Sequence, residues 1–404
     1  MEEWKTDKIE NLLDALIDYR GKTPQKVNMG IPLITAKIVK GGRIDTPEEF
    51  LAYDDYDSWM RRGYPQIGDV VLTTEAPLGE VAQISYLPVA LAQRIVTLRG
   101  KEGILDSTYL KYFLQSEIGQ KRLSARETGT TVTGIKQSEL RKVEITYPSF
   151  STQCKIASIL KSLDDKIELN NRINHNLEQQ AQALYKSWFV DFEPFKDGKF
   201  VESELGMIPE GWSVKKAEEF CEINIGKTPP RKEHQWFSND SSDVIWISIS
   251  DMGPSGVYIS KSSEMLTKEA CKKFNVVIVP EGTVLLSFKL TVGRVSIAAK
   301  NLTTNEAIAR FLVPTDAMRS YLYLALKSYD YSSLGSTSSI ATAVNSKIIK
   351  GMALLCPPED IIEKFGAQVT GMFSSIKTLQ NEISCLREQR DSLLPRLMSG
   401  KLTC

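Results

Sequence analysis

Histidine is scarce in this chain of 404 residues, which contains only His175 and His234. The six cysteines lie far apart and form no Cys-x-x-Cys pair, which argues against a zinc site and against a disulfide framework. No stretch approaches about 18 uninterrupted apolar residues, and the N-terminus lacks a basic flank leading into an apolar stretch. We therefore predict a cytoplasmic protein with reduced thiols and without a membrane span or signal peptide.

Sequence motifs for catalysis are also missing. There is no Gly-x-Gly loop after a strand, no Asn/Asp-Pro-Pro-aromatic run, no Gly-x4-Gly-Lys-Ser/Thr loop and no paired carboxylates before a lysine. Methyl transfer, nucleotide hydrolysis and DNA cleavage by this chain are therefore disfavoured. We predict a protein that is not an enzyme and that holds no metal or cofactor of its own.

An internal repeat is the most informative feature that is present. The run Gly-Lys-Thr-Pro at 21–24 returns at 226–229, an offset of 226 − 21 = 205 residues. Further matches follow in the same order: Trp4 with Trp212, Val70 to Leu72 approximately with Leu285 to Ser287, Gly129 to Thr131 with Gly335 to Thr337, and Tyr147 and Pro148 with Cys356 and Pro357. Matches in one order at a nearly constant offset indicate a duplicated domain. Two similar sites would then face one extended partner.

Each copy is predicted to have an α+β fold. Short apolar runs bounded by Gly, Pro and Asp predict strands at 31–38, 70–74, 81–85 and 94–98, followed by an amphipathic helix at 107–120. The second copy repeats this order, with strands at 244–249, 276–279, 283–288, 294–298 and 308–313 and a helix at 317–328. Short strands with few helices favour a curled sheet over a doubly wound one.

Each copy ends in a helix of about five heptads. The first seam contains Ile156, Leu160, Leu163, Ile167, Asn170, Asn174, Leu177, Ala181, Leu184 and Trp188, and the second contains Ile362, Phe365, Val369, Met372, Ile376, Leu379, Ile383, Leu386, Arg390 and Leu393. Pro395 is predicted to stop the second helix. Since the first helix leads away from one domain and the second leads back, we predict an antiparallel coiled coil.

Two asparagines interrupt the first seam, and two interpretations remain open for them. Asn170 and Asn174 could face Arg390 or glutamines of the other helix and fix the register of the pair. Alternatively, they could face solvent while Ile173 occupies the core.

Charge is balanced overall, with 50 basic and 50 acidic residues, but it is unevenly distributed. From Arg20 to Ile44 there are six cations and no acid, and from Gly282 to Asn305 there are Lys289, Arg294 and Lys300, again without an acid. Such loops could contact phosphates without strong indiscriminate binding. A solvated loop with no such role is the alternative for either stretch.

Several motifs together resemble the specificity subunits of type I restriction-modification systems. The resemblance covers nearly the whole chain, and it rests on Met207 to Trp212, both Gly-Lys-Thr-Pro runs, Trp188 to Phe192, Leu393 to Lys401, and the start of the first heptad helix with Gln153, Ile156, Leu160, Leu163, Asp164, Asp165, Ile167 and Asn170. It implies target recognition domains at 1–150 and 196–357, a central coiled-coil helix at 151–195, and a C-terminal helix and tail at 358–404. The two domains would read the two halves of a split, asymmetric sequence in double-stranded DNA.

The resemblance also implies site residues and partners. DNA contacts would come from Lys22, Thr23, Gln25, Lys26, Lys37 and Arg43 in the first copy, and from Lys227, Thr228, Arg231, Lys232, Lys289 and Arg294 in the second. In the repeated run, we expect Gly and Pro to shape the turn and Lys to contact phosphate. Exposed flanks of the helices, including Trp188 and Phe189, would dock two methyltransferase subunits, and restriction subunits would join through the complex. S-adenosylmethionine, ATP and Mg would then lie on those partners, and the alternative is a coiled-coil scaffold without DNA contact.

Overall fold

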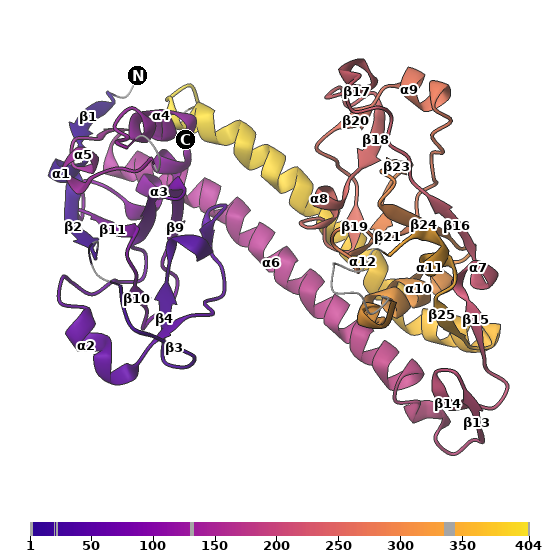
Figure 1. Cartoon of the computed structure of the whole chain (residues 1–404). Coiled ribbons are helices and arrows are strands. Elements are labelled where there is room, and N and C mark those ends of the chain that lie inside the picture. The colour runs from indigo at the N-terminus through magenta and orange to yellow at the C-terminus, as the bar shows by residue number, and fades with distance from the viewer. Residues whose placement is uncertain (1–2, 20, 22, 130–132, 335–343, 403–404) are drawn as a thin grey trace. The chain divides into compact units, whose positions relative to one another are not determined.

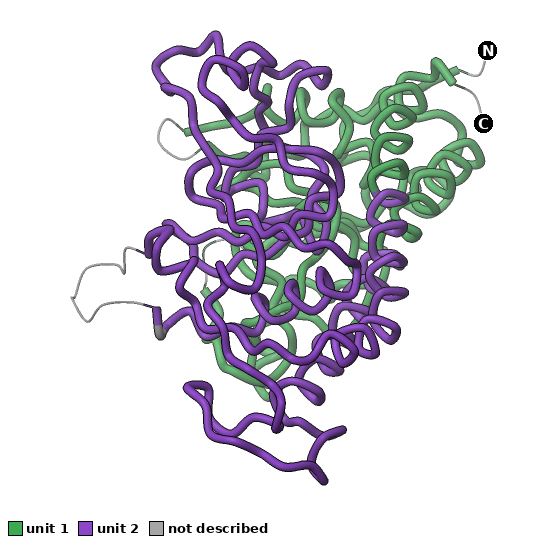
Figure 2. Tube along the Cα trace, turned by 90° about the vertical axis from the view of Figure 1, so that its right-hand side faces the viewer, with its two compact units in different colours: residues 1–168, 384–404 green, residues 169–383 purple. Residues whose placement is uncertain are grey.

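The computed structural model describes residues 3–19, 21, 23–129, 133–334 and 344–402. The chain divides into two compact units, which Figure 2 colours separately. Unit 1 comprises residues 1–168 and 384–404, and unit 2 comprises residues 169–383. Both units mix short strands and helices, as an α+β fold requires.

Unit 1 is built around a four-stranded antiparallel sheet in the order β2-β11-β8-β9. Figure 1 labels three of these strands, β2, β11 and β9. Its strands are β2 (Leu13–Asp18), β8 (Val70–Thr74), β9 (Leu78–Gln83) and β11 (Ile95–Gly100). Every residue of β8 is buried, which explains its uninterrupted apolar run. The predicted helix at 107–120 is two helices, α3 (Ser107–Gln115) and α4 (Glu117–Ser124). The break falls at Ser116, whose extended backbone and side chain cap α4.

A second sheet of unit 1 takes two of its strands, β3 and β4, from the basic stretch of the first copy. Its order is β10-β4-β7-β3, with β3 (Lys26–Val27), β4 (Ile31–Ile34), β7 (Phe50–Leu51) and β10 (Ala90–Leu91). The predicted strand at 31–38 ends at Ile34 and continues as a 3-10 turn, η1 (Ala36–Ile38). The remaining elements are β1 (Lys5–Lys8), α1 (Ile9–Leu12), β5 (Val39–Lys40), β6 (Arg43–Ile44), η2 (Tyr53–Asp55), α2 (Tyr56–Trp59), α5 (Gln137–Leu140) and β12 (Glu144–Tyr147).

Unit 2 repeats this plan with one extra strand on its central sheet. The order is β16-β24-β21-β22-β19, with β16 (Glu222–Ile225), β19 (Tyr258–Ile259), β21 (Val284–Ser287), β22 (Val295–Ala298) and β24 (Ile308–Leu312). Helix α10 (Asp316–Ser328) corresponds to α3. The predicted strand at 276–279 is wrong: the segment makes one isolated bridge, between Val279 and Leu302.

The second sheet of unit 2 has the order β17-β20-β18-β23. Its strands are β17 (Phe237–Ser238), β18 (Val244–Ile247), β20 (Met265–Leu266) and β23 (Thr303–Thr304). The remaining elements are η3 (Glu193–Phe195), β13 (Phe200–Ser203), β14 (Gly206–Pro209), β15 (Ser213–Lys216), α7 (Ala217–Phe220), η4 (His234–Trp236), α8 (Ile249–Met252), α9 (Lys268–Lys273), η5 (Tyr331–Leu334), α11 (Ser346–Lys350) and β25 (Ala353–Cys356).

Strand pairing confirms the duplication. In unit 1, β1 pairs with β12 so that Lys5 faces Tyr147, and in unit 2, β15 pairs with β25 so that Ser213 faces Cys356. The first strand of each pair therefore begins one residue after a matched tryptophan, Trp4 or Trp212. Its first residue faces the other matched residue, Tyr147 or Cys356. The other matched residues Thr130, Thr131 and Gly335 to Thr337 lie outside the described residues.

Two long helices complete the fold, α6 (Phe150–Phe189) and α12 (Glu359–Met398), and each contributes residues to both units. Within each unit the two helices pack antiparallel. Arg390 of α12 contacts Asp164 of α6 in unit 1, and Glu382 contacts Asn170 in unit 2. The predicted stop at Pro395 is wrong, because α12 continues to Met398. Leu397 and Met398 are buried in the core of unit 1, and this burial outweighs the backbone hydrogen bond that Pro395 cannot donate.

Candidate nucleic-acid interface

A groove of about 500 Å³ in unit 1 gathers part of the predicted DNA-binding set. Thr23, Lys26 and Lys37 line it, together with Lys40 and Arg94. Gln25 and Arg43 are exposed but lie outside the lining, and Lys22 lies outside the described residues. Arg94 was missed from sequence because it follows a separate strand; the hydrogen bond from Thr74 N to the Arg94 carbonyl brings it to the groove.

The cations of this groove are paired weakly. Lys26 lies 2.9 Å from Glu49, and Arg94 lies 2.9 Å from Glu75, with all four side chains at least one-third exposed. Lys37 reaches Glu48 only at 3.9 Å, and Lys40 forms no ion pair within the described part of the chain. Exposed pairs contribute at most about 1 kcal/mol each, so DNA phosphates can replace these carboxylates at small cost.

In unit 2 the repeated run is held by the domain itself. The Lys227 ammonium donates to the Phe274 carbonyl at 2.6 Å, and the Thr228 hydroxyl donates to Glu306. Gly226 lies so close to the chain at 304–305 that an added Cβ would meet the Asn305 carbonyl oxygen at 2.0 Å. The structural role expected of this glycine is therefore confirmed.

Other predicted cations of unit 2 also have partners within the domain. Arg231 lies 2.5 Å from Glu264 and stacks over the rings of Phe237 and Trp246. Arg294 donates to the Ile249 carbonyl at 2.7 Å. Lys232 and Lys289 are exposed, and the Lys289 ammonium lies 5.8 Å from the centre of the Phe288 ring.

Strand register identifies equivalent hairpins in the two units, β8–β9 and β21–β22. Val70 faces Gln83 in the first, and Val284 faces Ile297 in the second, so Val70 corresponds to Val284. The sequence match of Val70 with Leu285 was therefore off by one residue. The two hairpins also share a hydrogen bond at equivalent positions. In unit 1, Thr74 N donates to the Arg94 carbonyl, and in unit 2, Phe288 N donates to the Ala307 carbonyl.

The two hairpins differ in charge. Glu75 and Glu80 of unit 1 correspond to Lys289 and Arg294 of unit 2, and the apical residues Ala76 and Leu290 correspond to each other. Unit 1 therefore carries its positive charge on β3, η1 and β5, whereas unit 2 places basic residues on the hairpin.

The predicted seam residues lie along facing sides of the two helices. Ile156, Leu160, Ile167, Ile362, Phe365, Val369, Ile376 and Ile383 are buried, and Leu163, Leu177, Leu184, Leu379 and Leu386 are partly buried. Asn170 is fully buried, and its Nδ2 donates to Glu382 at 2.9 Å, whereas Ile173 is 37 % exposed. The interpretation that places Asn170 in the seam is confirmed, with Glu382 as its partner instead of Arg390.

The prediction that Trp188 and Phe189 form an exposed flank needs correction. Phe189 is 4 % exposed and packs against Trp212, Tyr321 and Phe365 in the core of unit 2. Trp188 is partly buried against Phe195 and Phe365. These aromatic residues attach the end of α6 to its own domain.

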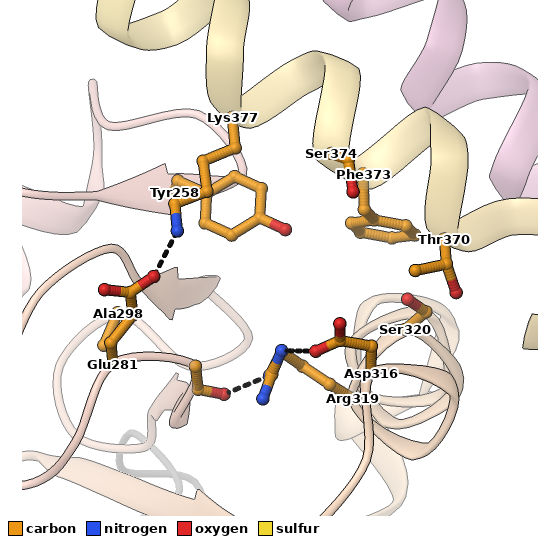
Figure 3. Close-up of a pocket in the computed structure, with 11 residues that line it drawn as sticks. Tyr258, Glu281, Ala298, Asp316, Arg319, Ser320, Thr370, Phe373, Ser374 and Lys377 are labelled. Atoms are coloured by element: carbon orange, nitrogen blue, oxygen red, sulfur yellow. Dashed lines mark hydrogen bonds and ion pairs between the residues drawn. The ribbon is translucent and has the colours of Figure 1, made fainter.

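A second pocket, of about 300 Å³, lies in unit 2 between α10, α12 and the central sheet (Figure 3). Its charges are internally paired, Arg319 with Asp316 and Lys377 with Glu281. This balance makes it a poor candidate for binding phosphate. Nearby, the Gln380 side chain donates to the Ser255 carbonyl at 2.7 Å and accepts from Tyr258 N at 3.0 Å, which attaches α12 to β19.

The residues that the structure describes contain no group of three or more His, Cys, Asp or Glu side chains that could hold a metal ion. Among the same residues, no helix is long and apolar enough to cross a membrane.

Comparison with known proteins places these features in a family. The family model described as the type I restriction modification DNA specificity domain matches residues 1–179 and 209–383. The chain is 30 % identical to the specificity subunit of the type I restriction enzyme MjaIX of Methanocaldococcus jannaschii, over 99 % of this chain and 94 % of that protein. It is 28 % identical to the specificity subunit of the HindI enzyme of Haemophilus influenzae, over 70 % of this chain and 74 % of that protein.

The fold also resembles a solved structure. The S subunit of a type I restriction-modification system from M. genitalium superimposes with a TM-score of 0.62 at 15 % sequence identity. The superposition covers 98 % of this chain and 96 % of the other. At this identity the likeness supports the fold alone.

Proposed function

The chain belongs to the family of DNA specificity subunits of type I restriction-modification systems, and from this premise we propose that it reads a DNA target in two unlike halves, one with each unit. The observation that carries this proposal is the pair of equivalent hairpins with opposite charge. Two copies of one domain would read identical sequences if their contact residues agreed. Here Glu75 stands where the exposed Lys289 stands in the other copy, so the two halves of the target should differ.

In unit 1 the groove supplies the contacts. Lys26, Lys37, Lys40 and Arg94 line one cavity. The first two and Arg94 form only weak surface ion pairs, and Lys40 forms none among the described residues, so all four are available to phosphates. Among the cations predicted to contact DNA in unit 2, Lys232 and Lys289 are exposed and available, whereas Lys227, Arg231 and Arg294 mainly hold loops in place.

The chain itself would catalyse nothing. We place methyl transfer on two methyltransferase subunits and DNA cleavage on restriction subunits that join through the complex. S-adenosylmethionine, ATP and Mg would bind those partners. The purified chain should accordingly transfer no methyl group to DNA until methyltransferase subunits are added.

The long helices offer a docking surface for the methyltransferase. Leu169 and Ile173 lie one turn apart on α6 and are 49 % and 37 % exposed. The adjacent seam residues of the same helix, Ile167 and Asn170, are buried. Large apolar residues on a packed helix pair are suited to a protein partner. Leu169→Asp with Ile173→Asp should reduce co-purification with the methyltransferase, and Val201→Asp, an equally exposed site on β13, should not.

DNA footprinting on the assembled complex tests the two-part reading. The target is first identified from the methylated motif in cells that express the system. The double variant Lys37→Ala with Lys40→Ala should weaken the footprint on one half of the target only. The double variant Lys232→Ala with Lys289→Ala should weaken the footprint on the other half only. Each variant should lower the slope of log affinity against log salt concentration by about 0.9 per lost phosphate contact.

Lys121→Ala is the matched control, since Lys121 is an exposed lysine of α4 outside the groove. Equal losses at both halves from either variant would contradict one unit per half-site. A complex that binds its target and random DNA alike would favour a scaffold without specific DNA contact.

A further inference from the structure

Leu290 is the most exposed large apolar residue in the described part of the chain. It is 99 % exposed and lies at the apex of the β21–β22 hairpin in unit 2, between Lys289 and Thr291. Its backbone is left-handed, with φ at 58°, and that of the equivalent apical residue Ala76 is left-handed too, with φ at 51°, so the hairpin imposes this conformation in both units. Full exposure of a large apolar side chain counts against a purely structural role for Leu290.

The hairpin that carries Leu290 is rigidly braced. The buried Ser287 hydroxyl donates to the Thr291 carbonyl at 2.6 Å and accepts from Arg294 N at 3.0 Å. Arg294 reaches across to the Ile249 carbonyl, and the Tyr331 ring packs beside Gly293. The equivalent of Ser287 in unit 1 is Thr73, whose hydroxyl oxygen accepts a hydrogen bond from Glu80 N at 2.9 Å. Hydrogen bonds therefore hold the backbone on both sides of the apex.

Register places Leu290 on the DNA-facing side proposed for unit 2. Its equivalent in unit 1, Ala76, lines the basic groove beside Thr23 and Pro24. In unit 2, the hydroxyl of Thr228 in the repeated run donates a hydrogen bond to the Glu306 carboxylate. The next residue, Ala307, accepts a hydrogen bond from Phe288 N of the hairpin through its carbonyl. The hairpin apex and the repeated run therefore lie on one face in both units.

We infer that Leu290 contacts the 5-methyl group of a thymine in the half-site that unit 2 reads. This inference rests on the proposed function and adds a residue that determines specificity. The thymine methyl is the apolar group that base edges present in the major groove, and an apolar side chain recognises it by contact. Lys289 beside Leu290 would hold the adjacent phosphate. Since Ala76 is too short to reach as far, the same contact is absent from unit 1.

Thymine-to-uracil exchange tests the contact, because it removes the methyl group and leaves base pairing unchanged. Binding of the assembled complex is measured on target DNA in which each thymine of the half-site is replaced by uracil in turn. Uracil at one position should weaken binding of the wild-type complex about fourfold, which is the loss of affinity expected when one methyl group is no longer buried. Leu290→Ala should weaken binding to thymine DNA at least as much and should be indifferent to uracil at that position. Leu290→Met should restore most of the affinity and the sensitivity to uracil.

Several results would overturn the inference. The first is that no uracil substitution changes the affinity of the wild-type complex. The second is that uracil still weakens the binding of the Leu290→Ala variant. The third is that the half-site read by unit 2 contains no A·T pair. Failure of the proposed function looks different, because the wild-type complex would then show no preference for its target. Hydrogen exchange of β21 and β22 that matches the wild type shows that unit 2 of the Leu290→Ala variant is folded.

Discussion

Arg390 of α12 donates through Nη1 to Oδ1 of Asp164 on α6, at 2.9 Å. The other oxygen of Asp164 accepts from the Tyr112 hydroxyl at 2.7 Å and from the Lys111 ammonium at 3.2 Å, both on α3. One carboxylate thus joins the helix of the recognition domain to both long helices within unit 1. Lys111 is buried, so removing this carboxylate would leave its charge without a counterion.

This cluster predicts an acid-sensitive unit 1. Burial alone would raise the pKa of Asp164, but Lys111, Tyr112 and Arg390 together lower it below its ordinary value. A carboxyl group with a lowered pKa in the folded chain stabilises the fold above its unfolded pKa of about 3.9, and this stability is lost as pH falls through the folded pKa. Protection of α3 amides from hydrogen exchange should therefore decrease below about pH 4.

Asp164→Asn provides the comparison. The variant should lower the free energy of local unfolding of α3 by about 2 kcal/mol at pH 7, because charge-assisted hydrogen bonds are lost. Its remaining stability should depend less on acid than that of the wild type. Asp165→Asn is the control, since Asp165 is exposed and pairs only with Lys161 in the described contacts. An acid profile that is identical in Asp164→Asn and the wild type would contradict the role of this carboxylate.

A second prediction concerns Asn170 in the helix seam of unit 2. Its Oδ1 is buried and has no hydrogen-bond partner among the described residues, while Nδ2 contacts Glu382. Asn170→Leu should raise the stability of the helix pair by about 1 kcal/mol, because it removes an unsatisfied polar atom and fills the same space. Hydrogen exchange of residues 167–177 measures this. Ile173→Leu, at an exposed position, should change nothing, and a net loss of stability in Asn170→Leu would show that the asparagine contributes more than register.

These two contacts show what sequence can and cannot predict. The heptad pattern places Asn170 and Arg390 in the seam, and both belong there. The partner of each depends on the stagger of the two helices, which a period of 3.5 residues does not define. Arg390 therefore pairs with Asp164, which lies 170 − 164 = 6 residues before the expected Asn170.

The repeat predicts the duplicated sheets, but it does not predict which side chains line the groove of unit 1 or lie at the hairpin apex of unit 2. Lys26 and Lys37 of the groove belong to a basic run, whereas Arg94 and Leu290 are isolated residues whose positions depend on strand pairing. Phe189 shows the opposite error. An aromatic residue at the end of a heptad helix suggests an exposed flank, but in three dimensions the domain that follows covers it.

A third prediction concerns two glutamines that fasten the long helices, one in each unit. Gln153 of α6 is fully buried; its Nε2 donates to the Ile104 and Pro148 carbonyls, and its Oε1 accepts from Asp106 N. Gln153→Leu would leave these backbone groups unpaired and should destabilise unit 1 by about 2 to 3 kcal/mol. Gln380→Leu should instead loosen α12 from β19 in unit 2.

Hydrogen exchange of the full chain distinguishes the two effects. Gln153→Leu should increase exchange at 104–115, and Gln380→Leu should increase it at 255–260, with each variant leaving the other segment unchanged. Equal effects of both variants on both segments would show that the units do not unfold separately.

The last prediction tests whether the helix pair sets the gap between the two half-sites proposed above. Glu168 and Ile383 are the residues at which the two helices pass from one unit to the other. One heptad inserted after each keeps the seam in phase and preserves the contacts within each unit. The helices lengthen by about 10 Å, which corresponds to about three base pairs of DNA.

Selection from a DNA pool with randomised spacers should therefore recover the same half-sites separated by a gap about three base pairs longer. Three base pairs also rotate the second half-site by nearly a third of a turn, since duplex DNA has about 10 base pairs per turn. Twisting of the DNA must absorb this angle, so the affinity should fall even at the best spacing. Because each unit keeps its own contacts, the half-sites should not change. Binding at the original gap with the original affinity would show that the helices do not set the spacing.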